Sequence, residues 1–253
     1  EDGYVSTSPV RPKVGVEERR DDRLVLIDLE RETVHHLDAS VLPRIADDPL
    51  AWLREDAGAG ADGDAGGDAG AEEEPEPRPF TVQRIEWSPD GGRVAIQARS
   101  NDNKDRWIAT VDLEGPALVP IHHLRDEAWI NWRYNEMGWT RDSETLWFLS
   151  EETGYGHLYA FEPESSETRQ LTGGRFTVRS VAEAPEGGRA YAITNRTHPG
   201  VYELERIDLA TGEAEPVTSL GGTVESFRLS PAGDRVLFTF STAMDPPELY
   251  VQD

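Results

Sequence analysis

Serine, thiol and metal chemistry each need a particular residue pattern, and the first two are missing from this sequence. A nucleophilic serine works from a strained turn between a strand and a helix, with the signature Gly-x-Ser-x-Gly, and this pentad does not occur in the 253 residues. Cysteine is absent, so disulfides and thiol catalysis are excluded. We therefore expect no catalytic residue in this chain.

The six histidines do not suggest a metal site either. His35-His36 and His122-His123 are adjacent pairs in expected strands, where neighbouring side chains point to opposite faces and cannot readily share one metal ion. His198 lies in a Pro-Gly turn, and we expect a structural role for His157. The sequence predicts neither a metal site nor a cofactor.

A repeated turn organises the chain. Residues 85–96 and 227–238 both indicate a strand, a tight turn and a strand, and weaker copies occur at residues 138–147 and 182–191. Proline presets φ at the second turn position, while Asp and Gly tolerate the left-handed conformations that follow. The turn position of Pro89 recurs at Arg141, Pro185 and Pro231, at spacings of 52, 44 and 46 residues. Each spacing is typical of one four-stranded propeller blade.

Further strands are expected between these turns. They fall at residues 106–113 with 118–124, 157–161 with 168–171, and 201–209 with 214–220. Residues 23–29 and 33–37 are typical of the two outer strands of an earlier blade, and the last repeat reaches residues 248–253 one strand short. The sequence thus predicts an all-β fold, a β-propeller of four-stranded antiparallel blades with about five blades, two of them incomplete.

Charge and composition exclude some classes of binding partner. The net charge of −24 disfavours nucleic acid and anionic membrane surfaces, and no apolar run is long enough for a transmembrane helix. Residues 56–78 hold eight acids and one arginine and no apolar residue larger than alanine, so we expect a flexible, solvated insertion there. Calcium binding by Asp62 and Asp64 is disfavoured, because a calcium loop needs further ligands at fixed spacing.

The most specific pattern lies between residues 121 and 159. An aromatic-rich entry at residues 129–134 precedes a short strand that ends at Trp139-Thr140, and the order Glu151-Glu152-Thr153-Gly154-Tyr155-Gly156-His157 follows. This pattern resembles a blade junction in the β-propeller of the dipeptidyl peptidase IV branch of the prolyl oligopeptidase family, and the likeness extends more weakly over roughly residues 82–252. The resemblance implies that residues 1–253 are part of a larger propeller, and that the family's α/β-hydrolase domain is absent from this chain.

The resemblance also implies one substrate-binding position. Counting back from the shared Glu136 and Thr140 places the family's pocket-lining aromatic residue and arginine at Trp132 and Arg133. An indole face can pack on a peptide side chain, and a guanidinium can bind carbonyl or carboxylate oxygens. The alternative is that Trp132 belongs to the blade core with the tryptophans at 129, 139 and 147, and that Arg133 is ordinary surface.

A second feature of the family has no clear counterpart. Dipeptidyl peptidases of this branch capture the amino terminus of the substrate with a Glu-Glu pair in an aromatic-flanked helix. The adjacent acids here, Glu17-Glu18, Glu72-Glu73-Glu74 and Glu151-Glu152, lie in no such context, and we expect Glu151-Glu152 in an exposed turn. The resemblance therefore implies a serine peptidase parent without deciding between a dipeptidyl peptidase and an oligopeptidase.

Taken with the resemblance, these observations predict a non-catalytic propeller domain that gates and binds peptide substrates for its own C-terminal hydrolase domain. Association with further copies of the chain is common in the family. One alternative is a stand-alone binding propeller similar to TolB-type or WD-repeat scaffolds, and a third is a five-bladed glycosidase with carboxylates converging at the channel. The lack of cysteine is compatible with the bacterial periplasm and with the cytoplasm.

Overall fold

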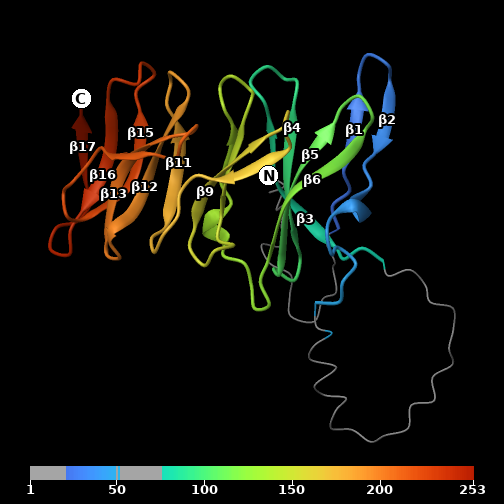
Figure 1. Cartoon of the computed structure of the whole chain (residues 1–253), viewed down its shortest axis with the longest axis horizontal. Coiled ribbons are helices and arrows are strands. Elements are labelled where there is room, and N and C mark those ends of the chain that lie inside the picture. Colours follow the sequence, from blue (N-terminus) through green and yellow to red (C-terminus); the bar gives the residue numbers. More distant parts are fainter. Residues whose placement is uncertain (1–20, 50, 52–75) are drawn as a thin grey trace, which may run out of the picture.

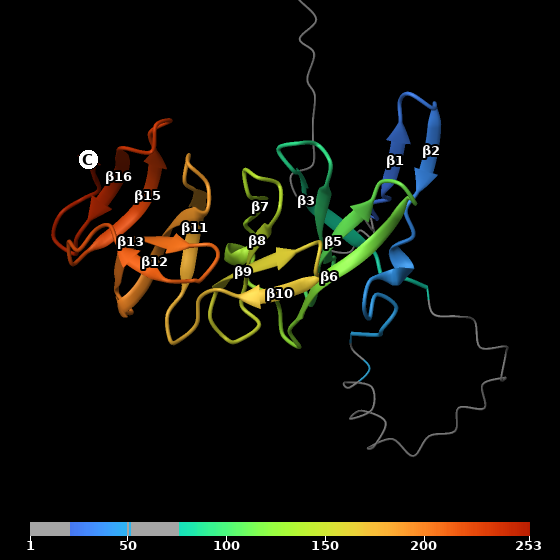
Figure 2. The same cartoon turned by 45° about the horizontal axis from the view of Figure 1, so that its top comes forward.

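The computed structural model describes residues 21–49, 51 and 76–253. Within these residues, four-stranded or smaller antiparallel units lie side by side in chain order, from β1 and β2 to β17 (Figures 1 and 2). The last two units are joined into one seven-stranded sheet by a single parallel pair, Tyr202 with Thr223. We number these units as blades. Blade 1 pairs β1 (Val25–Asp28) with β2 (Thr33–His36).

Blades 2, 3 and 4 have four strands each and blade 5 has three. Blade 2 contains β3 (Phe80–Trp87), β4 (Val94–Ser100), β5 (Asp105–Asp112) and β6 (Ala117–Arg125); blade 3 contains β7 (Met137–Trp139), β8 (Leu146–Ser150), β9 (His157–Glu162) and β10 (Glu167–Gln170). Blade 4 contains β11 (Val178–Glu183), β12 (Arg189–His198), β13 (Val201–Asp208) and β14 (Ala214–Pro216); blade 5 contains β15 (Thr223–Leu229), β16 (Val236–Ser241) and β17 (Glu248–Gln252). The expected β-propeller, with three complete blades and two incomplete ones, is confirmed.

The core lies between blades. Three of the four hydrophobic clusters each fill the boundary between two consecutive blades; Phe148 and Tyr159 of blade 3, for example, pack against Ile108 of blade 2. The short 3-10 helix η1 (Ala39–Val41) and the turn after it close the first boundary, where Leu42 and Ile45 are buried. A blade therefore obtains its buried apolar surface from its neighbours, as alternating apolar strands require.

The repeated turn has the same geometry in all four copies. The residue before each turn donates its backbone N–H to the carbonyl five residues on, in the pairs 88–93, 140–145, 184–189 and 230–235. The residue three positions after the donor has a positive φ in every copy, and it is glycine at 91, 187 and 233. Ser143 holds this position in blade 3 with φ 65°. Glycine adopts this conformation at low cost, so the exception at Ser143 needs a compensating contact.

One strand of blade 4 is much shorter than expected. Residues 214–220 were expected to form one strand, but β14 ends at Pro216. The backbone N–H groups of Val217 and Thr218 both bond to the carbonyl of Leu204, so the chain turns off the ladder here. The carboxylate of Glu203 then accepts bonds from the N–H groups of Leu220 and Gly221 (2.6 and 2.7 Å), which replaces the ladder.

Most of the acidic insertion expected at residues 56–78 lies outside the described residues. Its last residue, Arg78, is described, and its side chain is only 12% exposed. Arg78 pairs with Asp102 (2.9 Å) and Asp105 (2.7 Å) and donates to the carbonyls of Arg44 and Ile45. Arg78 is therefore held by ion pairs that the composition of residues 56–78 did not reveal. None of the helices in the described residues is long and apolar enough to cross a membrane.

Candidate functional site

A short turn carries the two residues singled out by the sequence. The 3-10 helix η2 (Trp132–Tyr134), which we call the rim turn, lies between blades 2 and 3 in the chain. Asn131 caps it by accepting a bond from the N–H of Arg133 (3.1 Å), and the N–H of Asn131 donates to the carboxylate of Glu151 (2.6 Å). Trp132 is 52% exposed and Arg133 is exposed as well. The structure thus brings both predicted residues to the surface, on adjacent positions of a capped turn.

The rim turn rests on a buried arginine. Arg106 at the start of β5 is fully buried and donates to the carbonyls of Tyr134 and Leu149, the second at 2.9 Å. Burial lowers the pKa of Arg106 to about 10, although the charges of Glu151 and Glu152 act in the opposite direction. Its guanidinium therefore remains charged at neutral pH and fixes the backbone of the turn to blade 3.

Gly156 fixes the other side of the turn. The ring of Tyr134 lies so close to its α-carbon that an added Cβ would overlap the ring. The glycine between Tyr155 and His157 in the sequence motif is thus explained by close packing with the rim turn. His157 itself is buried, with its ring nitrogens bonded to Thr172 and to the carbonyl of Gly174, which confirms a structural role.

Two further arginines stack on aromatic rings beside the turn. The guanidinium of Arg99, at the end of β4, lies over the indole of Trp132, and that of Arg179, on β11, lies 4.0 Å from the ring centroid of Tyr202. Burial lowers the pKa of Arg99 to about 10. Burial also lowers the pKa of Arg179, and the nearby charge of Arg133 lowers it further. The contact with Arg99 holds the Trp132 ring in place, and the contact with Arg179 does the same for Tyr202.

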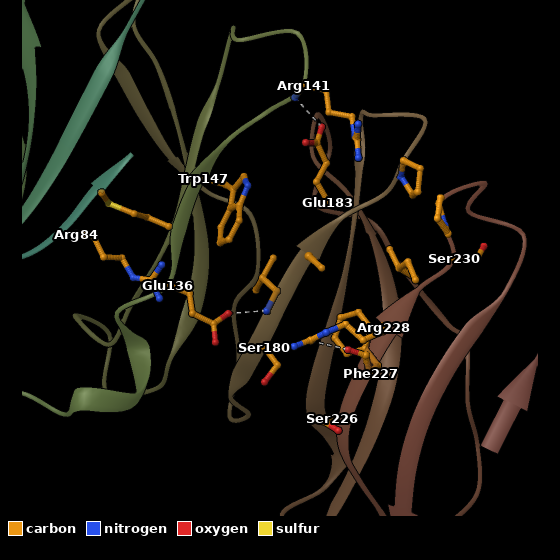
Figure 3. Close-up of a pocket in the computed structure, with 16 residues that line it drawn as sticks. Arg84, Glu136, Arg141, Trp147, Ser180, Glu183, Ser226, Phe227, Arg228 and Ser230 are labelled. Atoms are coloured by element: carbon orange, nitrogen blue, oxygen red, sulfur yellow. Dashed lines mark hydrogen bonds between the residues drawn. The ribbon is translucent and has the colours of Figure 1, made fainter. Parts of the chain in front are cut away.

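A groove of about 540 Å³ is lined by side chains that converge from four blades (Figure 3). Glu136 and Met137, which follow the rim turn in the chain, are among them, whereas Trp132 and Arg133 are not. Strands β3, β7, β11 and β15, the first of each blade from 2 to 5, contribute to its wall through residues such as Arg84, Met137, Ser180 and Phe227. Because the first strands of four consecutive blades line one groove, they lie on the side of the blades that faces the axis of a propeller, where a central channel is expected. We call this groove the channel groove.

Two glutamates bridge blades within the groove. Glu136 accepts a bond from the backbone N–H of Val181 (2.7 Å), and Glu183 accepts one from the N–H of Arg141 (3.1 Å), as the dashed lines in Figure 3 show. Burial raises the pKa of Glu183. The N–H of Val181 is available because β11 bulges between Arg179 and Ala182, where Ser180 has φ 54°. The wall of the groove thus carries acidic and basic side chains, among them Glu136, Glu183 and Arg228.

The remaining histidines and acids take structural roles. His122 and His123 point to opposite faces of β6, as expected: His122 contacts Glu152 (2.9 Å) and His123 contacts Asp105 (2.7 Å). Glu152 is in an exposed turn, whereas Glu151 is half-buried against Asn131 rather than exposed as expected. Glu17-Glu18 and Glu72-Glu73-Glu74 lie outside the described residues. Within the described part of the chain, no group of three His, Asp or Glu side chains is arranged to hold a metal ion.

Sequence reasoning missed Arg99, Arg106 and Arg179. Every residue of β4 is buried, so an arginine in that strand is anomalous and was a usable signal. The four tryptophans were treated as one group, but the structure divides them: Trp139 and Trp147 are buried at 7% and 8%, while Trp129 and Trp132 are exposed.

Comparison with known proteins agrees with this geometry. Residues 71–247, more than half of the chain, match the family described as the dipeptidyl peptidase IV (DPP IV) N-terminal region. Dipeptidyl peptidase 4 of Porphyromonas gingivalis has a similar structure, with a TM-score of 0.62 and 15% identity over 90% of this chain and 27% of that protein. A puromycin hydrolase variant in complex with PGG has a TM-score of 0.52 and 17% identity over 68% of this chain and 27% of that protein.

TolB from Acinetobacter baumannii has a TM-score of 0.48 and 18% identity, over 68% of this chain and 41% of that protein. At these identities the likeness extends to the fold alone. The chain spans between 27% and 41% of the length of these solved proteins.

Proposed function

The chain belongs to the family of the dipeptidyl peptidase IV N-terminal region, and on this premise we propose that it binds peptides and controls their access to the α/β-hydrolase domain of a serine peptidase. The observation that carries the proposal is the pairing of an exposed aromatic and an exposed arginine, Trp132 and Arg133, on a braced turn that precedes β7, one of the strands that line the channel groove.

The chemistry of this arrangement suits an extended peptide. The face of Trp132 that is turned away from Arg99 offers an apolar platform for a side chain, and Arg133 offers donors in a planar fork for carbonyl or carboxylate oxygens. Because Arg106, Glu151 and Gly156 hold the turn in place, binding orders few additional side chains and loses little free energy to conformational entropy.

The groove supports the same proposal at its polar wall. The backbone N–H groups of Val181 and Arg141 already donate to Glu136 and Glu183. A peptide would therefore bond mainly to side chains and to the remaining carbonyl groups. The channel would admit short or unfolded peptides and exclude folded proteins by size. Such gating acts on binding and on access, while the bond cleavage belongs to the hydrolase domain.

Titration calorimetry with peptides of two to five residues tests the binding step on this chain alone. We expect measurable affinity that Trp132→Ala and Arg133→Ala each weaken by about tenfold, or about 1.4 kcal/mol. Equal affinity in wild type and both variants would remove this turn from the binding site. Turnover of chromogenic dipeptide substrates by the isolated chain, blocked by a serine-directed phosphonate, would contradict the non-catalytic assignment.

Reading the gene beyond residue 253 separates the two classes of parent protein. A Gly-x-Ser-x-Gly motif followed by Asp and then His supports the peptidase. A stop codon after one more strand supports a stand-alone binding propeller, for which peptide binding would be the whole function.

A further inference from the structure

One buried tryptophan differs from the others in the use of its indole N–H group. The buried tryptophans of the described residues are Trp107, Trp139 and Trp147, which are 0%, 7% and 8% exposed. The N–H of Trp107 donates to the carbonyl of Pro43 (2.8 Å), and that of Trp139 donates to the carbonyl of Glu86 (3.0 Å). The N–H of Trp147 donates to no group in the described part of the chain. Because the N–H of a buried tryptophan usually has a partner, this donor is available to a ligand.

Trp147 lines the channel groove, and a glycine makes room for its ring there. Figure 3 shows the ring on the blade 3 wall of the groove, with Glu183 of blade 4 on the other side. Gly138 of β7 is directly opposite Trp147 of β8. A Cβ at Gly138 would lie 2.8 Å from Cζ2 of the indole and 3.3 Å from its Nε1. The missing side chain therefore lets the N–H side of the ring lie against the first strand of the blade.

This glycine is particular to blade 3. Gly138 stands three residues before the turn position of Arg141, and the equivalent residues of the other repeats are Glu86, Ala182 and Arg228. A side chain at this position would cover the part of the indole that carries the N–H. The pair of Gly138 and Trp147 is thus a local departure from the repeat that leaves one donor uncovered at the groove.

The surroundings of Trp147 favour an uncharged acceptor. An indole N–H donates and cannot accept, so its ligand must supply an acceptor atom. Glu136 precedes Gly138 by two residues, so its side chain lies on the same face of the chain, and it accepts the bond from the N–H of Val181 (2.7 Å). The negative charge of Glu136 would repel a carboxylate at this place. A carbonyl oxygen has no net charge and meets both conditions.

We propose that the indole N–H of Trp147 donates a hydrogen bond to a main-chain carbonyl oxygen of a peptide bound in the channel groove. The proposal rests on the proposed function and names a residue that positions the main chain of the peptide. Because Trp147 is 8% exposed, the bond would form where little water competes for the donor. Since every residue of a peptide has a main-chain carbonyl, such a contact suits peptides of varied sequence.

Two phenylalanine substitutions test the donor. Trp147→Phe removes the N–H and keeps an aromatic ring, so it should weaken the binding of acetyl-tetraalanine amide by about fivefold to tenfold in titration calorimetry. Trp139→Phe is the matched control, because Trp139 is buried to a similar degree and its N–H already donates to Glu86. It should leave the peptide affinity within about twofold and raise the equilibrium constant of unfolding about fivefold, since the carbonyl of Glu86 loses its donor.

Nuclear magnetic resonance observes the donor directly. The indole ¹H–¹⁵N resonance that disappears in Trp147→Phe should shift when the peptide is added, while the resonances of Trp107 and Trp139 should not. Replacing one carbonyl oxygen of the peptide at a time by sulfur, a weaker acceptor, should lower the affinity of the wild type at one position and leave that of Trp147→Phe unchanged there. The free-acid form of the peptide should lose as much affinity in Trp147→Phe as the amide does.

Each outcome bears on the proposal. Equal affinity of wild type and Trp147→Phe, with an unshifted Trp147 resonance, overturns the donor while peptide binding itself stands. A loss confined to the free-acid peptide assigns the contact to a carboxylate and overturns the main-chain carbonyl. An equal loss in Trp139→Phe assigns the effect to disturbed packing and overturns the site. Absence of binding by both peptides overturns the donor and the proposed function together.

Discussion

The hydroxyl of Ser143 accepts a hydrogen bond from the backbone N–H of Asp90, at 3.1 Å, across the boundary between blades 3 and 2. The carbonyl of Ser143 accepts a second bond across the same boundary, from the guanidinium of Arg93 (2.6 Å). Three of the four repeated turns have glycine where Ser143 stands. Ser143 is therefore less favourable than glycine for the backbone conformation of this turn, but its hydroxyl forms a hydrogen bond to the neighbouring blade.

Two substitutions separate these effects. Ser143→Ala keeps the left-handed strain and loses the hydroxyl bond, so we expect a loss of about 1 to 2 kcal/mol in the free energy of unfolding. Ser143→Gly loses the same bond but relieves about 1 kcal/mol of strain, so it should be nearly neutral. Urea unfolding of the three proteins measures both values. A glycine variant less stable than the alanine variant would contradict this account.

Asp105 should be the most costly acid to replace in blade 2. Its side chain is fully buried and contacts Arg78, His123 and Arg125. Asp105→Asn should lower the free energy of unfolding by about 3 to 5 kcal/mol, because it leaves buried positive charge uncompensated. Asp102→Asn is the control: Asp102 pairs with Arg78 too, but it is 29% exposed, and its loss should cost less than about 1 kcal/mol.

The same group predicts a pH dependence. Burial acts to raise the pKa of Asp105, but bonds and charges from His123, Arg78 and Arg125 outweigh it and hold the pKa below its ordinary value of 3.8. The native state therefore binds the proton less readily than the unfolded state. The stabilisation is present above about pH 4 and is lost as the pH falls through the lowered pKa. Urea midpoints between pH 6 and pH 2 should converge for wild type and Asp105→Asn at the acid end.

Trp132 and Arg133 should matter for binding and little for stability. In a parent peptidase of the kind proposed above, Arg133→Ala should lower kcat/KM by roughly tenfold, about 1.4 kcal/mol, mainly through KM. Trp132→Ala should do the same and lose at most about 1 kcal/mol of stability, because it is half-exposed and contacts Arg99. Trp147→Ala is the comparison, since this buried ring should cost about 3 to 5 kcal/mol.

Gly156 links the sequence motif to the rim turn. Gly156→Ala places a methyl group against the ring of Tyr134, so the ring and the turn must shift. We expect a loss of peptide affinity of at least tenfold together with about 1 to 3 kcal/mol of stability. Gly92→Ala is the control, because its Cβ would meet only the carboxylate of Asp90 at 3.4 Å. Restoration of peptide affinity in the double variant Gly156→Ala, Tyr134→Leu would confirm that the ring transmits the effect.

The acidic insertion before Arg78 should be dispensable for the stability of the fold. Replacing residues 56–75 by a short Gly-Ser linker should leave the thermal midpoint within about 2 °C, since loop length enters the closure entropy only logarithmically. The replacement stops before Arg78, which binds Asp102 and Asp105. A fall of several degrees would show that the acidic segment itself contributes contacts.

The spacing of the repeated turns predicted the blades, because turn chemistry is local and survives without knowledge of the partner strands. The bulges in the first strands could not be predicted from the sequence, because a bulge such as that at Ser180 depends on the register between β11 and β12. The same limit applied to the tryptophans: Trp132 and Trp139 are close in sequence, and only the rim turn decides that one is exposed and the other buried. Arg99 was missed because the strand pattern predicts which residues are buried, but it does not predict that the Trp132 ring covers the guanidinium of Arg99.

The shared hydrophobic clusters have a mechanical consequence. Three of the clusters each join two consecutive blades, and the bonds donated by Trp139 to Glu86 and by Val181 to Glu136 cross the same boundaries. A pulling force applied to the two ends of the chain acts equally on every boundary between blades. The boundary with the weakest contacts therefore sets the force at which the blades separate. The channel groove lies across several of these boundaries, so separation at any one of them would widen the passage before a single blade had lost its own strands.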